Sequence, residues 1–303
     1  MRKILLARFP IKIAILIYLK MVSSKLKRII KGVIGKKKIV KRKRKRKSIS
    51  IEEISAVLTE LGLNKGDVVL VHSGISNLGK VNKGAIGVFE LLKDRVGKDG
   101  CVLFPAFSFK GPMEGYLEGN PAISLDDDIT TMGALSKKAL SDSDCVRSVH
   151  PTHSVACIGD KCEKIISNHF DSVTSFDENS PFYKLIEEKG KILLIGVDLN
   201  SVTNFHVPES QMKDKYPLDV NLDEKYCISV TYKNNVKNVI TKVLDSRLSL
   251  IRDCNRLHDE LDRDGILNKV RIGSGFITLI DAFAFNEKVK ELALKGVTIY
   301  GNV

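Results

Sequence analysis

The sequence predicts an α/β fold in which helices surround a mixed sheet. Short apolar runs of strand length alternate along the chain with segments whose apolar residues recur at helical spacing. The strand-like runs are apolar almost throughout, which is typical of strands buried on both faces of a partly parallel sheet. With 303 residues the chain is long enough to bury a full core. We therefore expect one α/β domain, residues 48–303, preceded by a basic arm, residues 1–47.

The first predicted helix begins at a capping box. In the stretch Ser50-Ile-Glu-Glu53 the serine side chain is placed to accept the amide N–H of Glu53, whose carboxylate reaches back to the serine amide. Gly62 is a typical helix stop. Between these signals the apolar positions fit one helical face: Ile51, Ile54, Val57, Leu58 and Leu61.

Two buried strands with a helix between them follow in the chain. Residues 67–72 form an apolar run that ends in a histidine, and the small and polar residues 73–76 form the turn after it. Residues 84–96 have a helical pattern, and residues 100–104 form a second apolar run that Pro105 closes. This alternation is the pattern of a sheet that is parallel in part.

The second half of the chain supplies further strands. Residues 191–197 and 276–280 are apolar runs of strand length. Residues 225–244 instead alternate between apolar and polar around Lys233-Asn-Asn235. That pattern predicts an antiparallel hairpin, which we expect to join the same sheet.

The charge of the chain is concentrated at one end. Residues 1–47 contain 19 Lys and Arg and no Asp or Glu, whereas residues 48–303 contain 30 basic and 36 acidic side chains. The apolar centre of the arm, residues 13–19, is shorter than the roughly 20 apolar residues that a membrane-spanning helix needs. Basic residues interrupt its flanks, and Pro10 disfavours a continuous helix.

The basic arm therefore has three interpretations. An apolar patch followed by the polybasic run at residues 41–47 is the arrangement that attaches a protein reversibly to anionic lipid, and we favour this partner. A solvated tail of mutually repelling charges is the structural alternative. Nucleic acid, bound through its phosphates, is the third partner and the least favoured, because the chain has no Trp and few aromatic residues for stacking on bases.

The cysteines do not form a recognisable ligand or redox motif. The six residues contain no C-x-x-C pair, and the chain shows no secretory signal with a small-residue cleavage site. We therefore expect six reduced thiols, several of them buried, in a cytoplasmic protein whose arm attaches it to the inner face of the membrane. The cysteines are Cys101, Cys145, Cys157, Cys162, Cys227 and Cys254.

The strongest chemical signal follows the predicted strand at residues 191–197. His206 and Glu209 lie just beyond that strand, where open α/β sheets place their chemistry. On a helix, a spacing of three residues puts both side chains on one face. A histidine beside a carboxylate is the minimal set for general base catalysis, although such a pair also occurs at ordinary surface and core positions.

Several common catalytic motifs are absent from the sequence. It contains no phosphate-binding G-x-x-x-x-G-K-[ST] loop, no G-x-G-x-x-G after a strand, no H-E-x-x-H and no G-x-S-x-G. His150 and His153 are spaced for joint metal binding, but a proline lies between them and no third ligand is in register. We therefore predict no metal site, with a metal-dependent hydrolase that uses these two histidines as a competing hypothesis.

From about residue 51 onward the chain resembles the aminoglycoside 3-N-acetyltransferase family, also called the antibiotic acetyltransferase family. The resemblance rests on several motifs that occur in the family's order over roughly 250 residues. These motifs are Val71-His-Ser-Gly-Ile-Ser-Asn-Leu-Gly79, Thr131-Met-Gly-Ala-Leu135, Val146-Arg-Ser-Val-His-Pro-Thr-His-Ser154, Asn179-Ser-Pro181, Asn200-Ser-Val-Thr-Asn-Phe-His206 with Glu209, and Ile272-Gly-Ser-Gly275 with Leu279-Ile-Asp281.

The resemblance implies a single antibiotic-acetyltransferase-like domain that transfers an acetyl group from acetyl-CoA to a primary amine of an amino-sugar. It implies that His206 is the base, that Asp245 is the favoured carboxylate partner and that Glu209 is the other candidate. We expect these contacts on the acetyl-CoA side or in the oxyanion site: His72, Ser73, Ser76, Ser148, His150 and Ser154. For His150, the alternative is a role in packing its own loop.

The chain departs from the family pattern at three places. Gly74 replaces a usual serine, residues 80–84 lack the usual Gly-Gly pair, and Val207-Pro208 replaces a small pair before Glu209, which predicts a shifted helix start. These departures and the basic arm suggest an acceptor other than an antibiotic, such as an amino-sugar of surface-polysaccharide assembly. The competing class is a catalytically inactive, membrane-tethered binding protein of the same fold, and the sequence leaves an oligomer open.

An acidic cluster offers one candidate acceptor site. Asp126-Asp-Asp128 precedes the predicted helix start at Thr131-Met-Gly133. Its carboxylates would attract a polycationic amino-sugar, or they would simply compensate the dipole of the following helix from a solvated loop.

Overall fold

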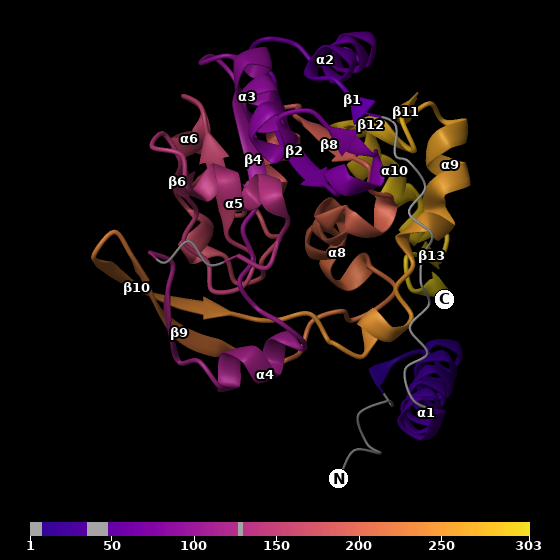
Figure 1. Cartoon of the computed structure of the whole chain (residues 1–303). Helices are drawn as coiled ribbons and strands as arrows, with labels where there is room; N and C mark the ends of the chain where they lie inside the picture. The colour runs from indigo at the N-terminus through magenta and orange to yellow at the C-terminus, as the bar shows by residue number, and fades with distance from the viewer. Residues whose placement is uncertain (1–7, 35–47, 127–129) are drawn as a thin grey trace.

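A seven-stranded sheet forms the centre of the molecule, in a computed structural model that describes residues 8–34, 48–126 and 130–303 (Figure 1). Its strands are, in chain order, β2 (Val68–Ser73), β4 (Cys101–Pro105), β6 (Val146–Arg147), β7 (Val155–Ile158), β8 (Lys191–Ile195), β11 (Leu267–Ile272) and β12 (Gly275–Asp281). Across the sheet they lie in the order β11-β12-β8-β2-β4-β7-β6. Strand β2 is parallel to both β8 and β4, and the other neighbours are antiparallel. The predicted mixed sheet is confirmed.

Helices cover both faces of this sheet. The helices of the first face are α2 (Ile51–Glu60), α3 (Gly84–Val96) and α5 (Ala134–Leu140), and those of the second are α6 (Cys162–Ile166), α7 (Pro181–Glu187), α8 (His206–Met212), α9 (His258–Arg263) and α10 (Ala282–Leu294). Side chains of β2 alternate between the two layers, since Val69 and Val71 pack with the first set and Val68 and Leu70 with the second. Burial on both faces explains why the strand sequences are apolar throughout.

The local signals of the first helix are confirmed. The Ser50 hydroxyl accepts the amide N–H of Glu53 (3.1 Å), and the Glu53 carboxylate accepts the amide N–H of Ser50 (2.8 Å). The helix ends before Gly62, whose φ of 79° lies in the left-handed region. The predicted start of a helix at the Thr131-Met-Gly133 motif is also confirmed, because Gly133 caps α5.

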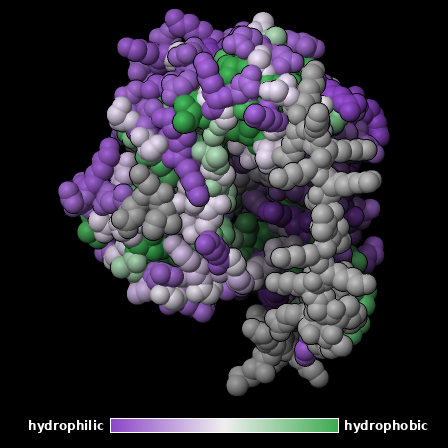
Figure 2. Space-filling model, viewed as in Figure 1, coloured by the Kyte–Doolittle hydropathy of each residue, from purple (hydrophilic) through white to green (hydrophobic). Residues whose placement is uncertain are grey.

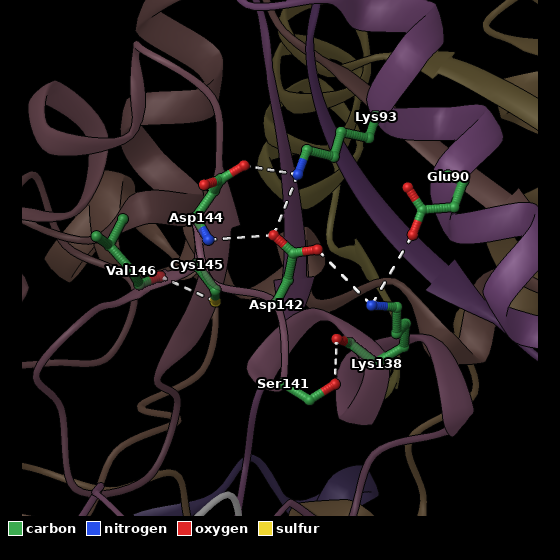
Figure 3. Close-up of polar contacts among 8 residues, drawn as sticks. All are labelled: Glu90, Lys93, Lys138, Ser141, Asp142, Asp144, Cys145 and Val146. Carbon is green, nitrogen blue, oxygen red and sulfur yellow. Dashed lines mark hydrogen bonds and ion pairs between the residues drawn. The ribbon is translucent and has the colours of Figure 1, made fainter.

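Helices α3 and α5 are also joined by a network of charged side chains (Figure 3). The Lys93 ammonium group donates to Asp142 (3.1 Å) and to Asp144 (2.7 Å). The Lys138 ammonium group lies 3.7 Å from Asp142 and 3.9 Å from Glu90. The turn after α5 is therefore tied to the exposed side of α3.

The predicted hairpin forms, but it does not join the main sheet. Strands β9 (Tyr226–Tyr232) and β10 (Asn235–Thr241) pair antiparallel, and β9 also pairs with β5 (Ala122–Ser124) in a separate three-stranded sheet. Its buried face packs on α4 (Met113–Glu118) in a third hydrophobic cluster. Our expectation of one continuous sheet is therefore wrong, because α4 and β5 bury this face of the hairpin instead. In Figure 1 this layer lies below the main sheet.

Short elements complete the fold. Strand β1 (Ser48–Ile49) pairs with β3 (Lys80–Val81), and β13 (Val297–Thr298) pairs with β14 (Gly301–Asn302). Short 3₁₀ turns include η2 (Ile75–Asn77) after β2 and η7 (Leu248–Leu250) after the hairpin.

The apolar part of the basic arm is helical. Helix α1 (Ile11–Ile34) begins directly after Pro10, so this proline precedes the helix and does not interrupt it. Phe9, Ile13 and Ile17 belong to the main hydrophobic cluster, so the start of the arm packs on the domain. The polybasic run at residues 41–47 lies outside the described residues, and the boundary at residue 47 stays a prediction. Within the described ranges, no helix has both the length and the apolar character of a membrane span.

The expectation of six reduced thiols is wrong in this structure. Cys157 and Cys162 form a disulfide, with their Cα atoms 5.6 Å apart. The tight turn between β7 and α6 brings these two residues together although they are not a C-x-x-C pair. The other four cysteines are not part of a disulfide, and Cys101 and Cys254 among them are buried, as predicted.

Candidate active site

A cavity of about 1110 Å³ opens where the parallel strands β2 and β4 end. The face in Figure 2 is hollowed near its centre, with both apolar and hydrophilic side chains around the hollow. Carboxyl ends of parallel strands are the usual place for a site in an α/β sheet. The charged and titratable side chains that line the cavity are His72, His153, His206, Arg252, Tyr226, Tyr300, Glu114, Glu118, Glu224, Asp245 and Arg247.

The ends of β2 and β8 approach each other closely beside this cavity. Gly196, just after β8, has a φ of 68°, in the left-handed region that favours glycine. Its carbonyl accepts a side-chain N–H of Asn77 (2.8 Å). A Cβ atom at Gly74 would lie 2.9 Å from the Asn77 side chain and 3.0 Å from that of Val197. The close approach of these two strand ends therefore leaves little room for a side chain at position 74, where this chain has glycine in place of the usual serine.

Two 3₁₀ turns lead from β8 to the candidate base. These are η4 (Leu199–Ser201) and η5 (Thr203–Phe205), and α8 begins at His206 directly after them. Pro208 lies in the first turn of α8, where its missing N–H removes no helical hydrogen bond. With Val207-Pro208 in place, α8 begins at His206, and the expected shift relative to the family stays a prediction.

His206 and Glu209 form a buried pair at the wall of the cavity. The imidazole Nδ1 lies 2.8 Å from Glu209 Oε2, and the two side chains are 4% and 1% exposed. The Nε2 atom lies 3.3 Å from Arg252 Nη1. A guanidinium group has only donors and a carboxylate only acceptors, so these partners assign the Nδ1–H tautomer with Nε2 as the acceptor. The expected proximity of His206 and Glu209 on one helix face is confirmed.

Tyr300 fixes the other oxygen of the Glu209 carboxylate. Its hydroxyl donates to Glu209 Oε1 at 2.9 Å. Burial and, next, the negative charge of Glu209 hold the pKa of Tyr300 well above its usual value, so this tyrosine remains a donor. The same two causes raise the pKa of the buried Tyr216. Glu209 thus has both oxygens engaged, which fixes its orientation toward the imidazole.

Asp245 does not contact His206, and this corrects our first choice of carboxylate partner. Its carboxylate accepts from the backbone N–H (3.0 Å) and from Nε (2.8 Å) of Arg247, whose second guanidinium nitrogen also pairs with it. The hydrogen bond to Asp245 raises the pKa of Arg247. Asp245 lines the cavity, but the carboxylate that holds the imidazole is Glu209.

Of the six residues expected on the cofactor side, two line the cavity. His72 ends β2, and its Nε2 atom is buried with no hydrogen-bond partner in the described part of the chain. Burial lowers the pKa of His72 to about 3, so the ring is neutral. Ser73 lines the cavity beside it. Ser76 is exposed in η2 and does not line the cavity, so its predicted contact stays a prediction.

His150 is fully buried and is not among the residues that line the cavity, so its predicted cofactor contact stays a prediction without support from the geometry. Its Nδ1 atom accepts the backbone N–H groups of Thr152 (3.3 Å) and His153 (3.2 Å). Its ring stacks on that of His169 with the ring centroids 4.5 Å apart. Burial lowers the pKa of His150 to about 3. The alternative, a histidine that packs its own loop, describes it.

Ser148 and Ser154 are also absent from the cavity lining, so their predicted cofactor contacts stay predictions. The Ser148 hydroxyl accepts the backbone N–H of Val155 (2.8 Å), and the Ser154 hydroxyl donates to the carbonyl of Ala106 (3.0 Å). Both serines are 1% exposed. A buried irregular segment has to satisfy its backbone groups internally, and these hydroxyls do so.

Sequence reasoning missed several side chains of the cavity, among them His153, Arg252 and Tyr300. His153 was visible in the His150-Pro-Thr-His153 motif, and it lines the cavity with its pKa lowered by burial. Arg252 and Tyr300 carry no local signal, because they reach His206 and Glu209 from 46 and 91 residues further along the chain.

The cavity also has an acidic side. Glu114 and Glu118 of α4 line it together with Glu224, and Glu114 Oε2 is buried with no hydrogen-bond partner in the described residues. Of the predicted acidic cluster, the structure describes Asp126, which does not line the cavity. Asp126 accepts the backbone N–H of Lys233 (2.5 Å), and Asp127 and Asp128 lie outside the described residues.

No set of histidines has the geometry of a metal site in the described part of the chain. Within it, the one group of three candidate ligands with all ligand atoms inside 4.8 Å of one another is Cys101, Cys157 and Cys162. Two of these sulfurs are joined in the disulfide. The geometry therefore gives no support to the hydrolase hypothesis based on His150 and His153.

Comparison with known proteins identifies relatives of this chain. The sequence model of the family described as aminoglycoside 3-N-acetyltransferase matches residues 70–293. An aminoglycoside N(3′)-acetyltransferase-like protein, YokD of Bacillus subtilis, is 34% identical over 174 residues, which cover 52% of this chain and 64% of the relative. Aminoglycoside N(3)-acetyltransferase III of Serratia marcescens is 30% identical over 176 residues, which cover 53% of this chain and 64% of the relative.

The matched part of this chain thus spans less than two thirds of these relatives. The structural similarity covers a larger part of both chains than the sequence similarity does. The solved structure described as AAC-IIIb binary with CoASH superposes with a TM-score of 0.64 at 21% identity, over 81% of this chain and 96% of that chain.

Proposed function

This chain belongs to the aminoglycoside 3-N-acetyltransferase family, and on that premise we propose that it transfers an acetyl group from acetyl-CoA to a primary amine of an amino-sugar. The observation that carries the proposal is the buried pair of His206 and Glu209 at the wall of the cavity. An imidazole oriented by a carboxylate on Nδ1 leaves Nε2 free to take a proton.

The chemistry needs such a base because the acceptor amine loses a proton as it reacts. In the proposed step the amine nitrogen attacks the thioester carbonyl carbon, and His206 Nε2 takes the N–H proton. The carbon–sulfur bond then breaks, and the CoA sulfur receives the proton from the imidazolium. Glu209 stabilises that imidazolium and holds the ring in place. This step requires the acceptor amine to displace Arg252, which lies 3.3 Å from Nε2 in this structure.

The thioester oxygen gains negative charge in the tetrahedral intermediate and needs donors in place. Arg252 is the nearest cation to the His206 ring, at 3.3 Å. The Ser73 hydroxyl and the neutral His72 imidazole line the same cavity, and a partnerless ring nitrogen of a buried histidine is suited to a ligand. These three groups are our candidates for the oxyanion site. The AAC-IIIb neighbour is described as a complex with CoASH, which supports the same co-substrate.

The acidic side of the cavity suits the acceptor. Glu114, Glu118 and Glu224 place negative charge where an aminated sugar would carry positive charge. The names of the relatives favour an aminoglycoside as acceptor. An amino-sugar of polysaccharide assembly is the second acceptor class, and the basic arm, which suggests work near a membrane, favours it.

The test is release of the CoA thiol from acetyl-CoA with a panel of aminoglycosides and aminated nucleotide-sugars. His206→Ala should lower kcat by roughly 10²–10⁴-fold with little change in CoA affinity. The matched control is His258→Ala, because this histidine is half-exposed and outside the large cavity. A KM that rises with kcat intact would make His206 a binding residue instead.

The competing function is a binding protein of the same fold that lacks catalysis. The intact His206–Glu209 pair and the open cavity argue against it. Absence of turnover with every amine, together with no CoA binding by calorimetry, would establish that alternative.

A further inference from the structure

Helix α1 carries apolar side chains on two opposite faces. Phe9 and the inner face of the helix, Ile13 and Ile17, are at most 5% exposed against the domain. The outer face carries six apolar side chains that recur every three or four residues and are 49–79% exposed. This set, the exposed stripe, is Ile11, Ile15, Tyr18, Leu19, Val22 and Leu26. A contiguous apolar stripe of this kind on a soluble protein marks an interaction surface.

The domain fixes the direction in which the stripe faces. Arg8 pairs with the carboxylate of Asp219 and donates to the carbonyl of Asn221 (2.5 Å), and Arg247 lies over the Phe9 ring, 5.2 Å from its centroid. Figure 1 shows α1 at the lower right, outside the sheet and its covering helices. Because Ile13 and Ile17 are fully buried against the domain, lipid cannot surround this helix while it stays docked. Such a helix lies along a surface.

The charge around the stripe selects the partner. Residues 8–34 contain seven Lys and Arg and no Asp or Glu. By helical spacing, the exposed Lys12 and Lys25 lie at the two borders of the stripe. A second copy would bring two such basic segments together, and nucleic acid would leave the aliphatic stripe in water. An anionic phospholipid surface offers headgroup charge to the lysines and acyl chains to the stripe.

We propose that the exposed stripe inserts into the headgroup region of an anionic bilayer, with α1 parallel to the surface. Met21 of α1 lines the cavity, and α1 contacts η7, whose residues also line it. Docking therefore holds the mouth of the cavity beside the lipid surface. The proposal rests on the stripe and its charge, and it holds whether or not the protein transfers acetyl groups.

The test is flotation of the full chain with vesicles of phosphatidylcholine alone or with about 30% phosphatidylserine. The stripe variant is Ile15→Ser, Leu19→Ser, Val22→Ser. The control changes three exposed apolar residues elsewhere: Val236→Ser, Phe283→Ser, Leu294→Ser. We expect the natural sequence and the control to float with the anionic vesicles. We expect the stripe variant to bind roughly 100-fold more weakly, because three apolar side chains no longer leave water.

Two results would overturn the proposal. Equal flotation of the stripe variant and the natural sequence would mean that charge alone attaches the protein. A dimer of the natural sequence in vesicle-free buffer that becomes a monomer in the stripe variant, measured by sedimentation, would make a second copy the partner. Circular dichroism of the stripe variant confirms that the fold is intact, since all three changed side chains are exposed.

Discussion

Two buried histidine environments differ in what surrounds the ring: that of His206 at the cavity, and that of His150, which packs against His169. His206 is 4% exposed, it has a carboxylate on Nδ1 and the Arg252 guanidinium 3.3 Å from Nε2, and it lines the cavity. His150 is 0% exposed, and its ring meets backbone amides, a threonine hydroxyl and the ring of His169. Both come from motifs that the family resemblance picks out. Burial is common to both, so a fixed carboxylate and access to a cavity are what mark a candidate base.

The sharpest test of this comparison changes the carboxylate. Glu209→Gln should lower kcat by roughly 100-fold, because an amide cannot stabilise the imidazolium as a carboxylate does. Asp245→Asn should lower it by less than about tenfold, since Asp245 lines the cavity but pairs with Arg247. Steady-state kinetics of acetyl transfer decide between them. A larger loss for Asp245→Asn would restore it as the partner of His206.

The second test removes a histidine of the packed group. His150→Ala should lower the free energy of unfolding by about 2–4 kcal/mol, because it leaves a cavity and removes the acceptor of two backbone N–H groups. The kcat of the folded fraction should stay within about threefold of the natural value. Urea unfolding and active-site titration measure the two quantities, with His258→Ala as the surface control. A loss of kcat with unchanged stability would return His150 to the active site.

The sequence predicted what is local, and the contacts it missed come from distant segments. The capping box at Ser50–Glu53 and the His206–Glu209 pair each lie within one helical turn, so spacing alone determines them. The hairpin was predictable from alternation, but its partner strand β5 lies about a hundred residues earlier. The choice of Glu209 over Asp245 depends on how the segment after the hairpin folds back, which no local pattern encodes.

The disulfide, which the sequence did not predict, and the buried serines depend on packing that residue type does not encode. Cys157 and Cys162 meet because of the exact path of the turn between them, and a spacing of five predicts neither a bond nor its absence. Ser148 and Ser154 have the residue type of an oxyanion site, but the buried loop uses their hydroxyls for its own backbone. Residue type therefore predicted chemistry at these positions, where packing determines the role.

The third test uses the pH dependence of stability to examine the buried histidines His72 and His150. Burial lowers the pKa of His72 and of His150 to about 3, below the unfolded value of about 6.5. Between these values the unfolded chain binds more protons, so stability is complete above about pH 6.5 and falls as the pH drops. Each such histidine should contribute a slope of about 1.4 kcal/mol per pH unit below about pH 5.5. His150→Phe should remove one such slope from urea unfolding measured between about pH 4.5 and 5.5. Parallel curves for His150→Phe and the natural sequence would contradict a neutral buried His150.

The smallest effect on stability is expected for the charge network between α3 and α5 (Figure 3). Unlike the buried histidines, this network is exposed to water. The hydrogen bond to Asp144 raises the pKa of Lys93 above its ordinary value. Burial opposes ionisation of Asp142, but hydrogen bonds from Asp144 and Lys93 outweigh it and lower that pKa. Water still reaches the network, because the Lys93 and Asp144 side chains are 32% and 64% exposed.

Lys93→Met should therefore cost less than about 1 kcal/mol of unfolding free energy, and added salt should shrink the difference. The control is Lys65→Met, which removes a fully solvated pair with Asp99 at 3.8 Å and should change nothing measurable. Urea unfolding at low and high salt measures both variants. A loss above about 2 kcal/mol that salt does not reduce would show that Asp142 behaves as a buried charge. The network would then resemble the environment of His150, where removing one partner leaves a buried polar group without its hydrogen bond.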